Sequence, residues 1–173
     1  MNERLKSRIL ISADSSAILV VDCQSGFDPG LTVADNGAPW TIIEAVLKHA
    51  TALAVPVVST IYAGDGASSV EPLPPIAHLD NITRSCVNPW EDDGVRAKVS
   101  ETGRNRIVIL GDCVEGGASF AALGALEIGY QPYVVVDAIK SASALDASTA
   151  LTRMTQAGII PVTSRQLLLE WGR

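Results

Sequence analysis

The residues best suited to chemistry stand in the stretch Gly111–Phe120, which reads GDCVEGGASF. An apolar run over residues 106–110 precedes it, and a helix-like segment ending at Gly129 follows it. This order predicts a strand, a tight turn and the start of a helix. The first turn of a helix presents unpaired backbone N–H groups and the positive end of the helix dipole. The turn therefore suits an anion, or an oxyanion that develops during a reaction.

Two charged residues stand at the ends of other expected strands. Asp22 closes the apolar run 17–22, and Arg84 closes the short strand expected at 81–84. Because ligand sites of parallel sheets form at the carboxyl ends of the strands, we expect Asp22, Arg84 and the turn at 111–117 to share one rim. A partly buried Asp22 with a raised pKa could donate a proton at neutral pH. The alternative is a solvated carboxylate that caps a turn.

Arg84 cannot serve as a proton carrier, because a guanidinium stays charged at ordinary pH. It could bind a substrate carboxylate through two parallel hydrogen bonds, or stabilise negative charge. It could also pair with Asp22, and that pair would keep Asp22 ionised and unsuited to act as an acid. The sequence leaves these alternatives open.

The stretch at 111–120 resembles the active-site turn of the isochorismatase-like (cysteine hydrolase) family. In most members the sixth residue after the first glycine is a nucleophilic cysteine, and here it is Gly117. Residues 20–27, VVDCQSGF, resemble the family's first motif, in which the aspartate is the general acid or base. Residues 84–90, RSCVNPW, resemble its second motif, with arginine at the usual lysine position.

The resemblance extends over residues 16–173 and implies a hydrolase acting on a small, anionic metabolite. It places the catalytic positions at Asp22, Arg84 and Gly117. Family members are commonly homo-oligomers, and most have a cis peptide before the cysteine, which would fall near Val114–Glu115. Phe27, Tyr62 and Trp90 are candidates for the pocket wall, with ordinary packing as the alternative. The expected substrate-binding residues are Gln24, Phe27, Asn88, Trp90, Cys113, Glu115, Gly116 and Ala118.

The glycine at position 117 leaves three interpretations. True isochorismatases resemble this pattern and cleave a vinyl ether by protonating carbon before water attacks, which needs an acid and no nucleophile. The chain could instead be a retired member that binds a small metabolite or serves as an oligomeric scaffold. A third interpretation moves the nucleophile to Cys113, whose alternative role is that of a small buried hydrophobic residue.

Composition argues against several other classes of function. The net charge is −6 with no basic run, so we expect no nucleic-acid partner. No segment approaches the roughly 20 apolar residues of a membrane span, so we expect a cytoplasmic protein without a membrane partner. Three cysteines without a CxxC pair and only two histidines offer little to a metal site or a Ser-His-Asp triad. No phosphate-binding glycine motif is present, and we expect no cofactor.

Strand-like and helix-like segments alternate along the 173 residues, which fit a single domain over residues 1–173. This alternation predicts a three-layer, Rossmann-like α/β fold with an approximately six-stranded parallel sheet and helices on both faces. Residues 62–80, rich in Gly, Ser and Pro, are expected to form a long functional loop. Strands are expected at 17–22, 56–61, 81–84, 106–110, 132–136 and 159–162, and helices at 39–54, 91–102, 117–128, 145–157 and from about 164 to 171.

Overall fold

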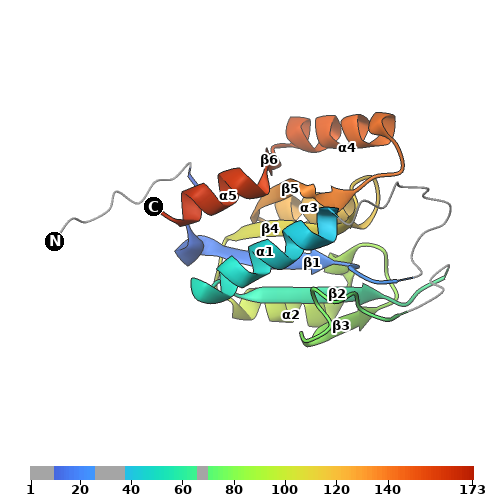
Figure 1. The fold of residues 1–173 in the computed structure, drawn as a ribbon. Helices are drawn as coiled ribbons and strands as arrows, with labels where there is room; N and C mark the ends of the chain where they lie inside the picture. Colours follow the sequence, from blue (N-terminus) through green and yellow to red (C-terminus); the bar gives the residue numbers. More distant parts are fainter. Residues whose placement is uncertain (1–9, 26–37, 66–69) are drawn as a thin grey trace.

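The computed structural model describes residues 10–25, 38–65 and 70–173, and it contains the expected parallel sheet. The six strands lie in the order β3-β2-β1-β4-β5-β6, and every neighbouring pair is parallel. Figure 1 shows the strands running through the middle of the molecule with helices on either side. The strands are β1 (Ser16–Val21), β2 (Val57–Tyr62), β3 (Asn81–Arg84), β4 (Arg106–Cys113), β5 (Gln131–Lys140) and β6 (Ile160–Val162).

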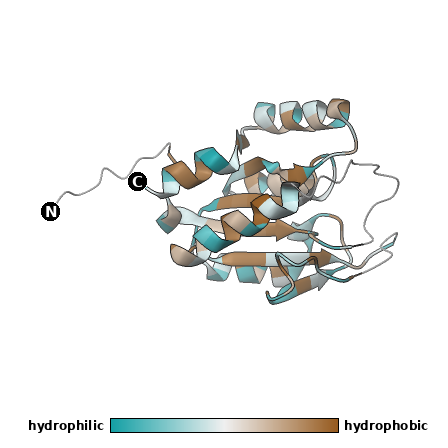
Figure 2. Cartoon of the chain, in the orientation of Figure 1, coloured by the Kyte–Doolittle hydropathy of each residue, from teal (hydrophilic) through white to brown (hydrophobic). Residues whose placement is uncertain are grey.

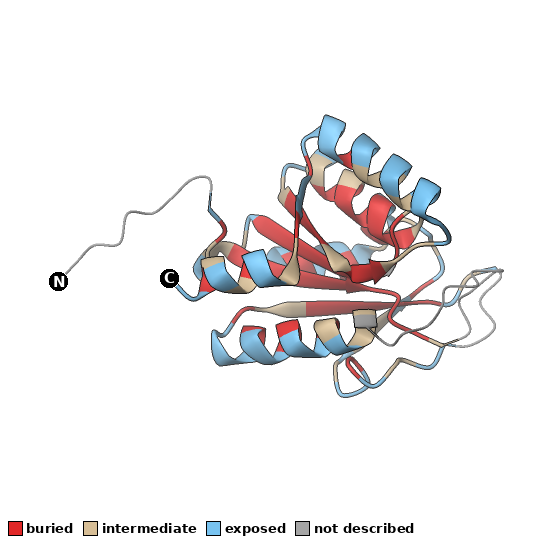
Figure 3. Cartoon of the chain, turned by 45° about the horizontal axis from the view of Figure 1, so that its top comes forward, coloured by how far each residue is buried: buried red, intermediate tan, exposed pale blue. Residues whose placement is uncertain are grey.

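Two layers of helices cover the two faces of the sheet. On one face, α1 and α5 pack on one hydrophobic cluster, and on the other face α2, α3 and α4 pack on a second cluster. The strands are the most apolar part of the chain, and most of their residues are buried (Figures 2 and 3). The helices are α1 (Ala38–Ala52), α2 (Asp93–Glu101), α3 (Gly117–Glu127), α4 (Ala144–Ala157) and α5 (Ser164–Trp171).

Local sequence signals explain where several helices begin and end. The Thr163 side chain accepts a hydrogen bond from the Gln166 N–H, and the Gln166 side-chain oxygen accepts one from the Thr163 N–H, which completes the expected capping box of α5. Gly158 ends α4 in the left-handed conformation, with φ of 103°. No described helix is long and apolar enough to span a bilayer.

The prediction of a helix over residues 91–102 is wrong for its first turn. A short 3₁₀ helix, η2 (Pro89–Glu91), comes first, and α2 starts only at Asp93. The break falls at Asp92, whose side chain accepts a hydrogen bond from the Val95 N–H at 3.0 Å and so caps α2.

The segment expected as a loop at 62–80 packs beside the chain that leaves β1. Residues 66–69 lie outside the described part. Leu73 donates its N–H to the Cys23 carbonyl at 2.8 Å, and Ser25 donates to the Glu71 carbonyl at 3.0 Å. These antiparallel contacts hold the segment at the carboxyl end of the sheet, next to Asp22.

Candidate active site

Asp22 lies directly after the central strand β1, and only 2% of its surface is exposed. Its backbone takes a φ of 52°, a left-handed conformation that is uncommon outside glycine. The Asp22 N–H still donates to the Thr60 carbonyl at 3.0 Å, so the turn starts from the last pairing of β1 with β2. This turn points a carboxylate into the rim from the middle of the sheet.

Arg84 forms a buried ion pair with Asp22. Its Nη2 donates to Asp22 Oδ2, and no part of the Arg84 side chain is exposed. Its Nη1 donates to the carbonyls of Cys86 and Val87, the latter at 3.0 Å. The guanidinium also lies 5.6 Å from the centre of the Tyr62 ring. Arg84 is therefore held by the protein itself, as the pairing alternative expected, and is not presented to solvent.

The ion pair does not turn Asp22 into an ordinary ionised carboxylate. Burial raises its pKa from 3.8 to about 6, because desolvation penalises the charged form. The positive charge of Arg84 and the hydrogen bond from the Thr60 hydroxyl, at 3.2 Å from Oδ1, act in the opposite direction but do not cancel this effect. The expected ion pair is therefore present, while the pKa of Asp22 lies above its usual value and not below it.

Gly117 begins α3 and faces the same carboxylate. A Cβ atom at this position would lie 3.1 Å from Asp22 Oδ2 and 3.1 Å from Val21 Cγ1. The expectation that Asp22, Arg84 and the 111–117 turn share one rim is thus confirmed. Within the described residues, no acceptor is found for the N–H groups of Gly117 and Ala118, as expected at a helix start.

Gly111 permits the close approach of β4 and β1 beneath this turn. Its φ is 127°, and a Cβ there would lie 2.1 Å from the Val21 carbonyl oxygen. Only glycine fits such a contact. Strand β4 therefore continues through Gly111 to Cys113, three residues further than the run 106–110 predicts.

Cys113 and Glu115 sit in the turn between β4 and α3. Cys113 is 8% exposed. Glu115 Oε1 accepts a hydrogen bond from the Ala142 N–H at 2.7 Å. Burial raises the pKa of Glu115, but this bond and one from the Cys113 thiol outweigh it and leave that pKa below its usual value. An ionised Glu115 beside the sulfur would repel a thiolate.

The cis peptide expected near Val114–Glu115 is not present, since every peptide bond among the described residues is trans. The turn is held instead by the Val114 N–H, which donates to the Lys140 carbonyl at 2.8 Å, and by the Gly116 N–H, which donates to the Cys113 carbonyl at 3.1 Å.

Three of the expected substrate-binding residues have structural partners. The Gln24 side chain donates to the Tyr62 carbonyl at 2.8 Å and accepts from the Tyr62 N–H at 2.7 Å. Asn88 caps η2 by accepting from the Trp90 N–H at 3.2 Å. Trp90 is 5% exposed, and its indole N–H donates to the Ala121 carbonyl in α3 at 2.6 Å, so it packs in the core. Phe27 lies outside the described residues.

Comparisons with known proteins agree with this architecture. The profile described as "Isochorismatase domain" matches residues 16–166. The chain belongs to the isochorismatase family. It is 28% identical over 164 residues to isochorismatase domain-containing protein 2A of Mus musculus, covering 92% of this chain and 76% of that protein. It is 32% identical over 72 residues to the probable hydrolase YcaC of Escherichia coli, covering 42% of this chain but only 35% of that relative.

Solved structures of the family share the fold. The E. coli YcaC structure, described as an octameric hydrolase of unknown specificity, superposes with a TM-score of 0.86 at 26% identity, covering 97% of this chain and 84% of that one. YcaC from Pseudomonas aeruginosa, determined with hexane-2,5-diol and covalent acrylamide, gives a TM-score of 0.86 at 24% identity, covering 96% and 85%. The chain is thus a member of the isochorismatase-like hydrolase family with a YcaC-type fold.

Thr60 is the residue of this isochorismatase-family site that sequence reasoning missed. It lies in the interior of β2 with no exposed surface, and its hydroxyl reaches Asp22 only because β2 is the neighbour of β1. The pair of hydroxyl residues Ser59 and Thr60 inside a strand of mostly apolar residues was the available signal. No group of three or more His, Cys, Asp or Glu suited to a metal is found in the described ranges.

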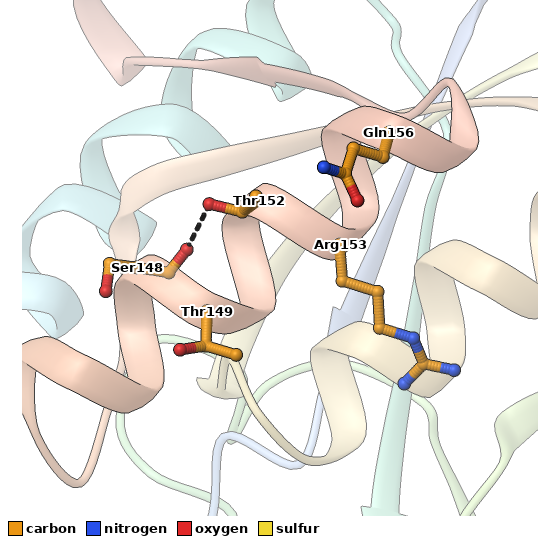
Figure 4. Close-up of a pocket in the computed structure, with 5 residues that line it drawn as sticks. All are labelled: Ser148, Thr149, Thr152, Arg153 and Gln156. Carbon is orange, nitrogen blue, oxygen red and sulfur yellow. Dashed lines mark hydrogen bonds between the residues drawn. The ribbon is translucent and has the colours of Figure 1, made fainter.

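The surface of α4 carries two open hollows that are separate from the Asp22 rim. The larger has a volume of about 330 Å³, and its lining side chains lie along the exposed side of one helix (Figure 4). Thr152 donates its hydroxyl back to the Ser148 carbonyl at 2.6 Å. The lining holds no paired titratable groups and offers no chemistry comparable to that of Asp22. Its residues are Ser148, Thr149, Thr152, Arg153 and Gln156.

Proposed function

We propose that this protein is a hydrolase that acts on a small, anionic metabolite without a cysteine nucleophile, with Asp22 as the general acid and base. The observation that carries the proposal is the buried Asp22, whose pKa is raised to about 6, facing the space that Gly117 leaves open. At pH 7 about a tenth of such a carboxyl is protonated, so it can both give and take a proton.

The arrangement fits the hydrolysis of a vinyl ether. Asp22 would transfer its proton to the terminal vinyl carbon, which leaves a positive charge shared by the neighbouring carbon and the ether oxygen. Water then adds to that carbon, and the ionised Asp22 takes back a proton. The hemiketal breaks its carbon–oxygen bond to give an alcohol and a carbonyl compound. This sequence consumes one water and requires no covalent enzyme intermediate.

Arg84 has a positioning role in this proposal. Its guanidinium stays hydrogen-bonded to Asp22 Oδ2 and to two backbone carbonyls. It would stabilise the Asp22 carboxylate that forms when the proton leaves, while burial keeps that carboxylate basic enough to recover a proton. The N–H groups at the start of α3 offer partial positive charge for an oxygen of the substrate.

Catalysis by a displaced Cys113 is the less favoured alternative. The thiol contacts Glu115, whose ionised form opposes the thiolate that such a mechanism needs. A retired, ligand-binding member remains the other rival, because both charged residues at the rim are buried and paired with each other.

We also propose that the protein assembles as a homo-oligomer, because a YcaC relative of the same fold is described as octameric. The cytoplasm is the proposed location. All three cysteines are free, which suits a reducing compartment.

A turnover screen by mass spectrometry tests the proposed function. Vinyl ethers, small amides and carboxylated metabolites are offered to the wild type, to Asp22→Asn and to Asp14→Asn, a control at an exposed position of η1 (Ala13–Ser15). We expect turnover in the wild type and in Asp14→Asn, and a loss of about a hundredfold or more in Asp22→Asn. Turnover that survives in Asp22→Asn but is lost in Cys113→Ser would contradict the proposal and identify Cys113 as the catalytic residue.

A further inference from the structure

An anionic substrate needs a positive partner other than Arg84. Arg84 is fully buried, and its Nη atoms are bound to Asp22 and to the carbonyls of Cys86 and Val87. A substrate carboxylate could reach it only by displacing Asp22, which would remove the proposed acid from its position. Among the described strands, only β3 and β5 end in a cation, and the second of these cations is Lys140.

Lys140 ends the strand two places away from β1, at the same edge of the sheet as Asp22. Val21 pairs with Gly111 and Gly111 with Ile139, and after a shift of register Cys113 pairs with Lys140. Because neighbouring strands are about 4.8 Å apart, the two backbones are separated by roughly 10 Å. The turn that begins α3 lies between them, bound to β5 by the hydrogen bond from Val114 to Lys140. Asp22 and Lys140 therefore lie at one edge of the sheet, on either side of this turn.

The Lys140 ammonium is placed where a positive charge is otherwise unfavourable. Its Nζ lies 4.2 Å from the centre of the Trp40 ring, in the first turn of α1. That turn contains no acidic residue, and the N-terminal end of a helix repels cations. Within the described chain, Lys140 has no carboxylate at ion-pair distance. The indole face compensates only part of this cost, and an anion bound there would meet two sources of positive potential.

We propose that Lys140, held over Trp40, and the first turn of α1 form a subsite that binds the carboxylate of the substrate. The inference rests on the proposed function for its substrate, but the subsite is defined by these groups alone. The carboxylate would accept a hydrogen bond from Lys140 Nζ while the reacting end of the molecule extends along the rim toward Asp22 and Gly117. Trp40 holds the ammonium in place before the anion arrives.

The test is a binding titration that does not depend on turnover. Propionate, and propionamide as its neutral counterpart of the same shape, are added to the full-length protein at constant ionic strength while tryptophan fluorescence is followed. The variants are Lys140→Gln, Lys140→Arg and the control Lys48→Gln, which removes one exposed positive charge elsewhere on α1. Trp90 and Trp171 are 5% exposed, so Trp40 is the indole placed to respond.

We expect the wild type to bind propionate saturably and not propionamide. Binding should weaken about tenfold or more in Lys140→Gln and be largely kept in Lys140→Arg and Lys48→Gln. Equal propionate affinity in the wild type and Lys140→Gln, equal loss in Lys48→Gln, or no propionate binding by the wild type would overturn the proposal. Propionate binding that depends on Lys140, without turnover that depends on Asp22, would refute the proposed hydrolase and support the subsite. Turnover that depends on Asp22, without propionate binding that depends on Lys140, would support the hydrolase and refute the subsite.

Discussion

At the scale of single residues, the chemistry of the site depends on how the protein surrounds one carboxyl group. Arg84 and Thr60 each donate to an oxygen of Asp22, and both contacts favour the ionised form. Burial favours the neutral form and is the larger effect, so the pKa rises to about 6. The same arginine that neutralises the carboxylate therefore does not bring its pKa below the usual value.

The space beside Asp22 is the residue-scale feature most easily tested. In Gly117→Ala the new methyl group would lie 3.1 Å from Asp22 Oδ2 and from Val21 Cγ1, so the carboxylate must move by a few tenths of an ångström. We expect turnover to fall by about tenfold to a hundredfold, because small displacements of a reacting group are costly. The melting temperature should change little. Unchanged turnover would mean that the substrate does not use this space.

At the scale of helices and strands, most boundaries could be predicted from local signals. Continuous apolar runs predicted the buried strands, and the Thr163 and Gly158 signals predicted the helix boundaries that the structure has. Three features could not be predicted. The strand expected at 132–136 continues to Lys140, and the strand expected at 106–110 continues to Cys113, because each pairs with a neighbouring strand. The bond from Thr60 to Asp22 depends on which strands are neighbours. All three are properties of strand pairing, which a single strand's sequence does not contain.

Strand pairing gives a prediction for Gly111. In Gly111→Ala the methyl group would meet the Val21 carbonyl oxygen at 2.1 Å in a backbone conformation of φ 127°. We expect the free energy of unfolding to fall by more than about 3 kcal/mol. Gly103→Ala is the matched control: its φ of 64° is also positive, but nothing lies within 4 Å. That control should lose only about 1 kcal/mol. Equal losses of unfolding free energy in the two variants, measured in urea, would show that the backbone conformation alone explains why position 111 requires glycine.

At the scale of the whole molecule, the strand order decides the environment of the site. Strand β1 lies inside the sheet between β2 and β4, so Asp22 receives Thr60 from one side and the α3 turn from the other. Helix layers on both faces remove solvent from the strands that lead to it (Figure 3). The raised pKa is therefore a consequence of the central position of β1 as much as of any single neighbour.

This burial links the stability of the whole protein to pH. Asp22 has a pKa of about 6 in the folded protein and near 3.8 when unfolded, so the folded state holds the proton more tightly. Stability from this group is fully present below the lower value and is lost as the pH rises through about 6. The difference corresponds to about 3 kcal/mol. Asp22→Asn cannot titrate, so between about pH 3 and about pH 8 the wild type should lose about 3 kcal/mol relative to the variant in urea unfolding. Other titrating groups cancel in this comparison. Parallel curves for the two proteins would show that Asp22 has the same pKa folded and unfolded, and the proposed acid would lose its physical basis.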